Sequence, residues 1–313
     1  MTSAPWDPDR PLDAALASSA LRENFADLPV RSVALLGQGW DFDAYLVNDS
    51  MVFRFPRRRE SESKLLFEIE FLEQFAPLSP VHVPVYSLEG APGQTFPYTF
   101  ACYSIVQGRS GMESTLPASS IAAEGQRMGS FLSLLHGQSI DRALALGVET
   151  LGEADTPEGV RAASIDDLEW LKGVMPAALF DRVSAYFEDV TNMPEDYTGP
   201  SRLVHRDLGA EHIILSEDHR RIAGVIDWSD VSIGDPAIDF AALWAWLGDA
   251  IVEAALETYD LPVDAGLAGR VRYIGTHMAV ANLSYGFHAG RAEYMSAGLA
   301  WLGRIFEGRQ AKE

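Results

Sequence analysis

Short apolar runs, each bounded by glycine or by polar residues, recur through the first third of the chain. Runs of this length with tight turns between them are typical of antiparallel strands, and Asn48-Asp49-Ser50 is such a turn. Apolar residues three and four positions apart, with charges between them, indicate amphipathic helices instead. The elements predicted in this part are a leading helix at 11–29, strands at 33–36, 44–47, 51–55, 81–88 and 97–106, and a helix at 60–75.

Beyond residue 119 the apolar positions follow helical spacing over most of the chain. Two short apolar runs, 213–215 and 222–226, flank a polar turn and predict one β-hairpin. The polar segment 156–166 is expected to be a loose connection or an acceptor-site insert. Helices are predicted at 119–136, 168–174, 177–190, 237–247, 251–259, 265–287 and 293–306. This pattern predicts an α+β fold of two lobes, 1–106 and 107–313, with the site in the cleft between them.

Side chains that can carry chemistry gather around the predicted hairpin. Asp207 and His212 precede its first strand, and Asp227 ends its second strand. Because both ends lie at one edge of a small sheet, we expect the three side chains to converge. Two carboxylates and an imidazole suit a divalent cation and a nucleophile that must be oriented, which phosphoryl transfer requires.

The order and spacing of these residues also carry a resemblance to a known family. The matching positions are His205 and Asp207, His212, Ile226-Asp227-Trp228, and Gly234-Asp235-Pro236 with Asp239. This set resembles the catalytic segment of the aminoglycoside phosphotransferase family of kinase-like antibiotic phosphotransferases. A His five residues after the Asp, where most members carry Asn, is similar to the 2''-aminoglycoside and macrolide branches. The resemblance covers nearly the whole chain and implies a protein-kinase-like fold, with an antiparallel-sheet N-terminal lobe and a mostly helical C-terminal lobe.

By this resemblance, Asp207 is the catalytic residue that orients the acceptor hydroxyl and takes its proton. His212 and Asp227 would hold Mg²⁺ on the phosphates of ATP or GTP. We expect His205 to brace the loop rather than to carry a proton. The two later acidic residues, Asp235 and Asp239, are expected to cap and anchor the helix that follows them.

The first lobe is expected to bind the nucleotide. Gly37 and Gly39 resemble the glycines of the family's nucleotide loop, whose backbone N–H groups approach phosphate. The next positions, Asp41 and Asp43, are not phosphate ligands and should loosen the loop's grip. The strand position where the family usually has Lys holds Arg54, which keeps the charge and can bind phosphate. By resemblance, Glu68 pairs with that cation; the alternative is a solvated charge on the helix surface.

The segment after the last predicted strand resembles the family's hinge between lobes. Backbone groups near Ser104 and Val106 would bind the edge of the purine base. Tyr103 falls where a bulky side chain would shape the base pocket, and ATP versus GTP stays open. Its place in an apolar run also fits a simple core residue.

Composition limits the partners. The formal net charge of −21 argues against nucleic acid, whose binding requires many Lys and Arg residues, and favours a cationic small molecule. Acidic composition that merely keeps the chain soluble would give the same charge. The apolar runs are shorter than the ~20 residues of a membrane span, and residues 1–10 lack a signal-peptide pattern. With Cys102 as the single cysteine, we expect a monomeric cytoplasmic protein.

These features predict an antibiotic phosphotransferase, with an aminoglycoside as the first acceptor. Acidic residues of the second lobe, Asp230 and Glu293, would bind its ammonium groups. A macrolide or peptide antibiotic is the alternative, and Trp244 and Trp246 would line an apolar cleft for a macrolide. A housekeeping choline, homoserine or sugar kinase of the same fold, and a catalytically silent nucleotide-binding protein, also stay open.

Overall fold

A computed structural model describes residues 8–307 of the chain. The chain divides into two compact units. The first comprises the chain up to Gln107 together with Ile226–Asp230, and the second comprises Gly108–Val225 and the chain from Val231 onward. The short segment Ile226–Asp230 therefore belongs with the first unit although it follows a strand of the second.

The first unit is built on a five-stranded antiparallel sheet of order β1-β2-β3-β5-β4. Asn48 and Asp49 adopt positive φ angles of 52° and 58° in the β2–β3 turn, which polar residues of this kind tolerate and which suits a tight hairpin. The predicted meander is confirmed. The elements are α1 (Ala14–Asn24), β1 (Val33–Gln38), β2 (Phe42–Val47), β3 (Met51–Pro56), α2 (Arg59–Phe75), η1 (Ala76–Leu78), β4 (Tyr86–Gly90) and β5 (Phe100–Ser104).

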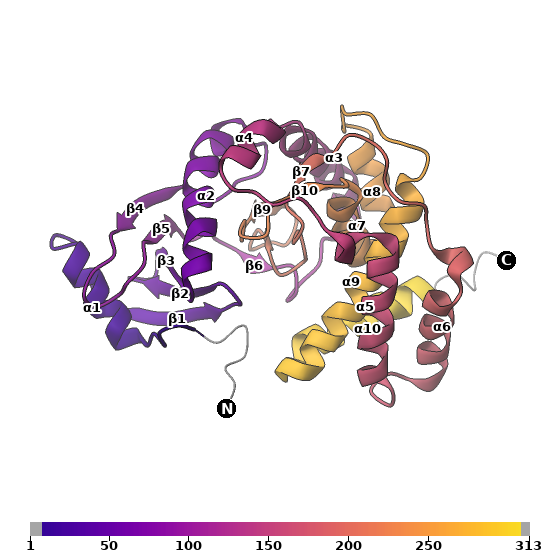
Figure 1. Cartoon of the computed structure of the whole chain (residues 1–313), viewed down its shortest axis with the longest axis horizontal. Helices are drawn as coiled ribbons and strands as arrows, with labels where there is room; N and C mark the ends of the chain where they lie inside the picture. Colours follow the sequence, from indigo (N-terminus) through magenta and orange to yellow (C-terminus); the bar gives the residue numbers. More distant parts are fainter. Residues whose placement is uncertain (1–7, 308–313) are drawn as a thin grey trace. The chain divides into compact units, whose positions relative to one another are not determined.

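The two faces of this sheet carry different helices, as Figure 1 shows. Phe53 and Phe55 of β3 point into a cluster that includes Ala17 and Leu21 of α1. Arg54 lies between them, so the alternation of a strand turns its side chain toward the face covered by α2. One strand therefore supplies core side chains to one face and a buried cation to the other.

Several predicted ends in this unit are wrong by a few residues. Asp13 caps α1 by accepting from the N–H of Leu16 at 2.8 Å, so the helix begins after Pro11 rather than at it. The strand predicted at 81–88 begins at Tyr86. Pro80 and Pro84 explain the delay, because proline lacks the N–H that a strand ladder needs.

The second unit is mostly helical and is centred on α9, which packs against α5, α7 and α10. Two small sheets, β7–β10 and β6–β8–β9, accompany the helices, and the β8–β9 pairing confirms the predicted hairpin. The helices are α3 (Ala118–His136), α4 (Ile140–Ala145), η2 (Glu153–Asp155), α5 (Pro157–Leu171), α6 (Ala177–Glu188), η3 (Val190–Asn192), α7 (Ala237–Leu247), α8 (Asp249–Leu256), α9 (Leu267–Ala289) and α10 (Ala292–Glu307). The strands are β6 (Arg109–Ser110), β7 (Arg202–Val204), β8 (Ile213–Leu215), β9 (Ile222–Val225) and β10 (Ser232–Gly234).

The loose connection expected at 156–166 is wrong, because this segment is the first part of α5. Thr156 caps the helix by accepting from the N–H of Gly159 at 3.2 Å, and Pro157 occupies the first helical turn. Thr156 and Pro157 together signal the start of a helix, but the polar composition of the segment led to its prediction as a loop.

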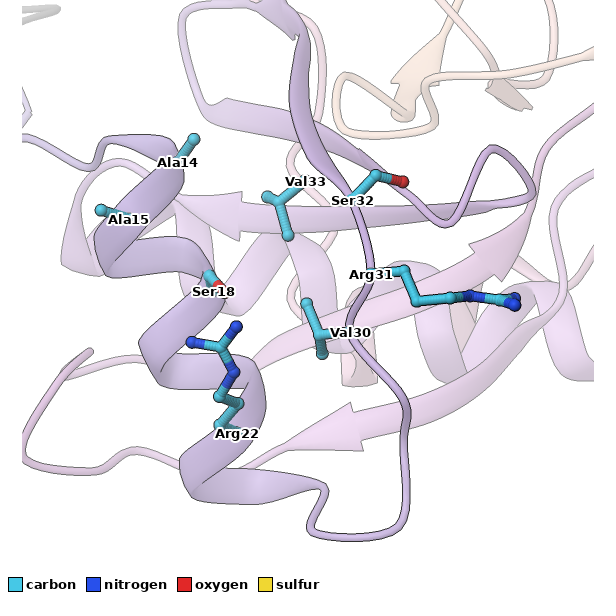
Figure 2. Close-up of a pocket in the computed structure, with 8 residues that line it drawn as sticks. All are labelled: Ala14, Ala15, Ser18, Arg22, Val30, Arg31, Ser32 and Val33. Atoms are coloured by element: carbon cyan, nitrogen blue, oxygen red, sulfur yellow. The ribbon is translucent and has the colours of Figure 1, made fainter.

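A shallow hollow of about 280 Å³ lies between α1 and residues 30–33, with Arg22 and Arg31 at its sides (Figure 2). None of the residues predicted to bind nucleotide lines it. Across residues 8–307, no helix has both the length and the apolar character required to cross a membrane.

Candidate active site

The centre of the first unit is a buried ion pair. The guanidinium of Arg54, through Nη1, donates to both carboxylate oxygens of Glu68 at 2.8 and 2.6 Å. The carboxylate also accepts from the hydroxyl of Tyr86 at 2.8 Å. Glu68 is fully buried, so the predicted pair is confirmed and the surface alternative for Glu68 is wrong.

Arg54 also holds Asp227. Its Nη2 donates to Oδ1 of Asp227 at 2.7 Å, and the Ser229 hydroxyl donates to the same oxygen at 3.0 Å. Asp227 adopts a positive φ of 61°, and the next residue, Trp228, is fully buried against Phe71 and Phe75 of α2. The tryptophan therefore anchors the segment and presents the carboxylate beside Arg54, with 37% of its side chain exposed.

Burial and charge act together on this group. Burial raises the pKa of Glu68 to about 7, with the positive charge of Arg54 opposing that rise. Burial alone would lower the pKa of Arg54, but the charges of Asp227 and Glu68 outweigh it and hold this pKa above its ordinary value. Arg54 thus stays charged, and Glu68 titrates near neutrality.

Two acidic residues, Asp41 in the β1–β2 loop and Asp43 in β2, bind basic residues in or just before α2. Asp41 accepts from Arg58 at 2.9 Å, from Ser61 at 2.7 Å and from Lys64 at 2.7 Å. Asp43 pairs with Arg57 at 2.9 Å. The two acidic residues therefore fasten this part of the chain, and their expected effect on the loop's grip on phosphate stays a prediction.

Gly37 lies near the end of β1 and Gly39 in the loop that follows it. Open space surrounds the Cα of Gly37, and the N–H of Gly39 donates to the carbonyl of Phe42 at 2.9 Å. The open space at Gly37 is compatible with the predicted approach of phosphate, whereas the N–H of Gly39 is already bonded within the protein.

The predicted hinge lies at the end of β5. Tyr103 is buried and packs edge-on against Tyr86, with ring centroids 5.5 Å apart. Ser104 is exposed and closes the pairing of β5 with β3 opposite Met51, while Val106 is partly exposed. Tyr103 is therefore both a core residue and a neighbour of the Arg54–Glu68 pair, so its two interpretations are compatible.

In the second unit the structure brings Asp207 and His212 together. The Nδ1 of His212 lies 2.9 Å from the carbonyl of Asp207 and 3.3 Å from its Oδ2. The side chain of Asp207 is 46% exposed and that of His212 is 18% exposed. An Nδ1 held at the loop backbone fixes the ring, which favours Nε2 as the atom offered to a ligand.

Asp239 holds the loop that carries Asp207. Its two carboxylate oxygens accept from the backbone N–H groups of His205 and Arg206, each at 2.9 Å, and Nε2 of His136 lies 3.1 Å away. All of Asp239 is buried. The prediction that Asp239 caps the following helix is therefore wrong, because its partners lie in the loop.

The neighbouring Asp235 does cap α7. It accepts from the N–H of Ala237 at 2.9 Å and also binds Arg270 at 2.6 Å. His205 is fully buried, as expected of a residue that braces the loop.

The acidic residues predicted to bind the acceptor have other partners. Asp230 belongs to the first unit, not to the second lobe, and pairs with Lys64 at 3.2 Å. Glu293 pairs with Arg291 at 2.5 Å on the exposed start of α10. Trp244 and Trp246 are 6% and 4% exposed, so their place is in the core.

Two residues near Asp207, namely Glu211 and Tyr294, were missed by the sequence analysis. Glu211 and Asp207 both act on Tyr294 of α10: burial raises the pKa of the Tyr294 phenol, and these negative charges raise it further. The charges of Asp207 and Glu211 therefore reach Tyr294 of α10, where the charge of Arg291 opposes them. Glu211 adjoins His212 in the sequence motif, but a single Glu gives no signal of such a neighbour.

The two side chains predicted to bind the metal are of types that bind divalent cations. Asp227 offers a partly exposed carboxylate and His212 a partly exposed imidazole, which are ordinary ligands of divalent metals. Within residues 8–307, neither unit by itself holds three His, Cys, Asp or Glu side chains grouped for a metal ion. The shared metal stays a prediction, because its two ligands belong to different units.

An antiparallel sheet with a buried Arg–Glu pair, together with a helical unit carrying an H-x-D loop, defines a kinase-like phosphotransferase. The chain belongs to the phosphotransferase enzyme family, whose model matches residues 32–270.

Solved structures of similar fold include the GDP complex of aminoglycoside 2'-phosphotransferase-IIIa, with a TM-score of 0.71, 24% identity, and coverage of 95% of this chain and 100% of that one. Macrolide 2'-phosphotransferase MphH from Brachybacterium faecium has a TM-score of 0.57 at 24% identity, covering 93% and 98%. Both likenesses concern the fold.

Two sequence relatives match part of the chain. Viomycin phosphotransferase of Streptomyces vinaceus is 34% identical over 102 residues, which is 32% of this chain and 35% of the relative. The uncharacterized protein YcbJ of Bacillus subtilis (strain 168) is 28% identical over 135 residues, or 42% and 41%. The chain thus spans less than half the length of these relatives.

Proposed function

We propose that the protein transfers the γ-phosphoryl group of ATP or GTP to a hydroxyl group of a small cationic antibiotic, with an aminoglycoside as the first candidate. The observation that carries the proposal is Arg54, buried between Glu68 and Asp227. A cation in this position can bind donor phosphates, and the partly exposed carboxylate beside it can bind their metal ion. Membership of the phosphotransferase family supports it.

Each side chain then has a role that its position supports. Asp207 orients the acceptor hydroxyl through its carboxylate and takes its proton. Arg54 clamps the donor phosphates and is held in place by Glu68. Asp227 and Nε2 of His212 would hold Mg²⁺, which neutralises charge on the transferring phosphoryl group. Positioning and charge neutralisation account for most of the rate in such transfers.

The nucleotide would lie along the first unit. Backbone N–H groups of the loop at Gly37 and Gly39 would approach its phosphates. Backbone groups at Ser104 and Val106 would bind the purine edge, with Tyr103 shaping the base pocket. Similar folds have been solved as complexes with GDP and with ATP, and both nucleotides therefore belong in the test.

A cationic acceptor fits the second unit. Glu211 adds negative charge close to Asp207 and Tyr294, where ammonium groups of an acceptor would be attracted, whereas Glu293 already pairs with Arg291. Asp230 is a weaker candidate than the sequence indicated, because Lys64 already neutralises it. We also propose a monomer that works in the cytoplasm and binds neither nucleic acid nor membrane; the net charge of −21 supports the absence of nucleic-acid binding.

A peptide antibiotic is the second candidate. The 34% identity to viomycin phosphotransferase over 102 residues favours it. The macrolide alternative loses support, because Trp244 and Trp246, which were expected to line its apolar cleft, are buried.

The test is an acceptor panel. Kanamycin, gentamicin, streptomycin, viomycin, a macrolide and choline are each incubated with the protein, Mg²⁺ and either ATP or GTP, and products are read by mass spectrometry. We expect one phosphoryl group to be added to an aminoglycoside or to viomycin. Exclusive phosphorylation of choline, or nucleotide binding without transfer to any acceptor, would contradict the antibiotic assignment.

The imidazole ligand gives a second readout from the same assay. Because a neutral imidazole is softer than the usual Asn carbonyl, we expect activity with Mn²⁺ as well as Mg²⁺. Activity confined to Mg²⁺ would count against His212 as a ligand.

A further inference from the structure

Lysine is rare in this chain, and one lysine lies inside the proposed nucleotide site. Of the 24 Lys and Arg residues, three are lysines: Lys64, Lys172 and Lys312. Lys64 is on α2, one helical turn before Glu68, so both side chains leave the same face of the helix. Glu68 holds Arg54 from this face, and Lys64 therefore places a second positive charge beside the same group.

The ammonium of Lys64 joins two segments of the first unit. Its Nζ donates to Oδ2 of Asp41 at 2.7 Å and to Oδ1 of Asp230 at 3.2 Å. Asp41 follows the glycines of the β1–β2 loop, and Asp230 lies three residues after Asp227. Lys64 therefore lies between the loop and the carboxylate that are proposed to face the donor phosphates.

Lys64 also has capacity for a ligand. An ammonium group has three N–H donors, and two of them are directed at these carboxylates. The Lys64 side chain is 37% exposed. By contrast Arg54 is buried, binds two carboxylates and has the ring of Phe42 at 4.1 Å from its guanidinium carbon.

We propose that Lys64 is a second donor-phosphate contact, which supplies from α2 part of the role that the family's strand lysine has elsewhere. This inference rests on the proposed function. Its ammonium would direct its third N–H to a phosphate oxygen while the carboxylates of Asp41 and Asp230 keep it in place. The charge is secure: burial lowers the pKa of Lys64, but the charges of Asp230 and Asp41 outweigh it and leave this pKa above its ordinary value.

Calorimetric binding of a nucleoside and its triphosphate, ATP with adenosine and GTP with guanosine, tests the contact. We expect Lys64→Gln to weaken triphosphate binding about tenfold, as loss of one charged hydrogen bond does, and to leave nucleoside binding unchanged. Lys64→Arg should recover part of the affinity. Asp230→Asn is the matched control, because it breaks the same ion pair and keeps the ammonium, so triphosphate affinity should hold or rise.

The outcomes separate the two proposals. A wild-type protein that binds no triphosphate contradicts the proposed function itself. If wild type binds and Lys64→Gln binds equally well, or if Lys64→Gln and Asp230→Asn weaken binding by the same factor, Lys64 contacts no phosphate and serves only as a brace.

A labelling experiment on the wild type removes any dependence on folded variants. In an acyl-phosphate derivative of ATP or GTP, the ε-amine of a nearby lysine attacks the acyl carbon, forms an amide and releases the nucleotide. We expect label on Lys64 that excess unmodified nucleotide blocks, with the exposed Lys172 of the second unit as internal reference. Equal labelling of Lys172, or no protection of Lys64, would overturn the proposal.

Discussion

Two fully buried carboxylates, Glu68 in the first unit and Asp239 in the second, organise their surroundings by different means. Glu68 binds a charged side chain, and that side chain in turn holds Asp227. Asp239 accepts from the backbone N–H groups of His205 and Arg206 and thereby fixes the loop ahead of Asp207.

The difference matches the role proposed for each unit. In the first unit the contacts are between charges, so an incoming anionic ligand competes for them and can rearrange them. In the second unit the contacts are to the main chain, so the loop keeps its shape whatever ligand is present. Charged contacts that a phosphate can join suit the proposed donor site, whereas a loop held through its main chain suits a group proposed to meet one hydroxyl.

The largest expected effect concerns the group that the second unit fixes. Asp207→Asn should lower kcat about 10³-fold, because proton acceptance and orientation are both lost. Nucleotide affinity should not change, since the carboxylate serves the acceptor. Steady-state rates and calorimetry check both, with Asp218→Asn in the β8–β9 turn as control. Undiminished turnover in Asp207→Asn would show that another group takes the proton.

Glu68→Ala tests the charge-based half of the comparison. Removing one partner of a buried ion pair leaves Arg54 underpaired, and we expect a loss of about 3 kcal/mol in the free energy of unfolding. Chemical denaturation measures it. Glu73→Ala, an exposed position on the same helix, should change stability by less than about 0.5 kcal/mol. A Glu68→Ala protein as stable as wild type would mean that the pair contributes nothing.

Asp239→Asn tests the backbone-based half. An amide offers one acceptor oxygen where the carboxylate offers two, so one of the N–H groups of His205 and Arg206 faces an NH₂ group. We expect a loss of about 2 kcal/mol in stability and a lower kcat at unchanged nucleotide affinity. Denaturation and kinetics together check this; weakened nucleotide binding with full turnover would contradict the assignment to the loop.

The most gradual effect is the pH dependence of stability. The folded-state pKa of Glu68 is raised to about 7 from an ordinary 4.5, so the folded protein binds this proton more tightly than the unfolded chain does. The stability that Glu68 contributes is therefore fully present below pH 4.5 and is lost as pH rises through 7. The slope is at most about 1.4 kcal/mol per pH unit, and Glu68→Gln should remove it. Identical pH profiles for the two proteins would contradict the raised pKa.

The sequence predicted well what local pattern controls. Apolar spacing and turn residues predicted the β1–β3 meander, α2, the β8–β9 hairpin and α7. The pairing of Arg54 with Glu68, 14 residues later, was predicted from the resemblance to the family. What it missed depends on distant contacts. Asp239 looked like a helix cap, because nothing local shows that the N–H groups it binds lie 33 and 34 residues earlier. Segment Ile226–Asp230 was assigned to the second lobe because its packing on α2 through Trp228 is invisible in the chain order.

The central claim is that Asp227 and His212, one from each unit, share one metal ion on the donor nucleotide. Pulsed electron paramagnetic resonance of the Mn²⁺–nucleotide complex tests it most directly. The account predicts nitrogen coupling from an imidazole in wild type, loss of that coupling with the metal retained in His212→Asn, and weak metal binding in Asp227→Asn. Nitrogen coupling that persists in His212→Asn, or undiminished Mn²⁺ affinity in Asp227→Asn, would contradict it.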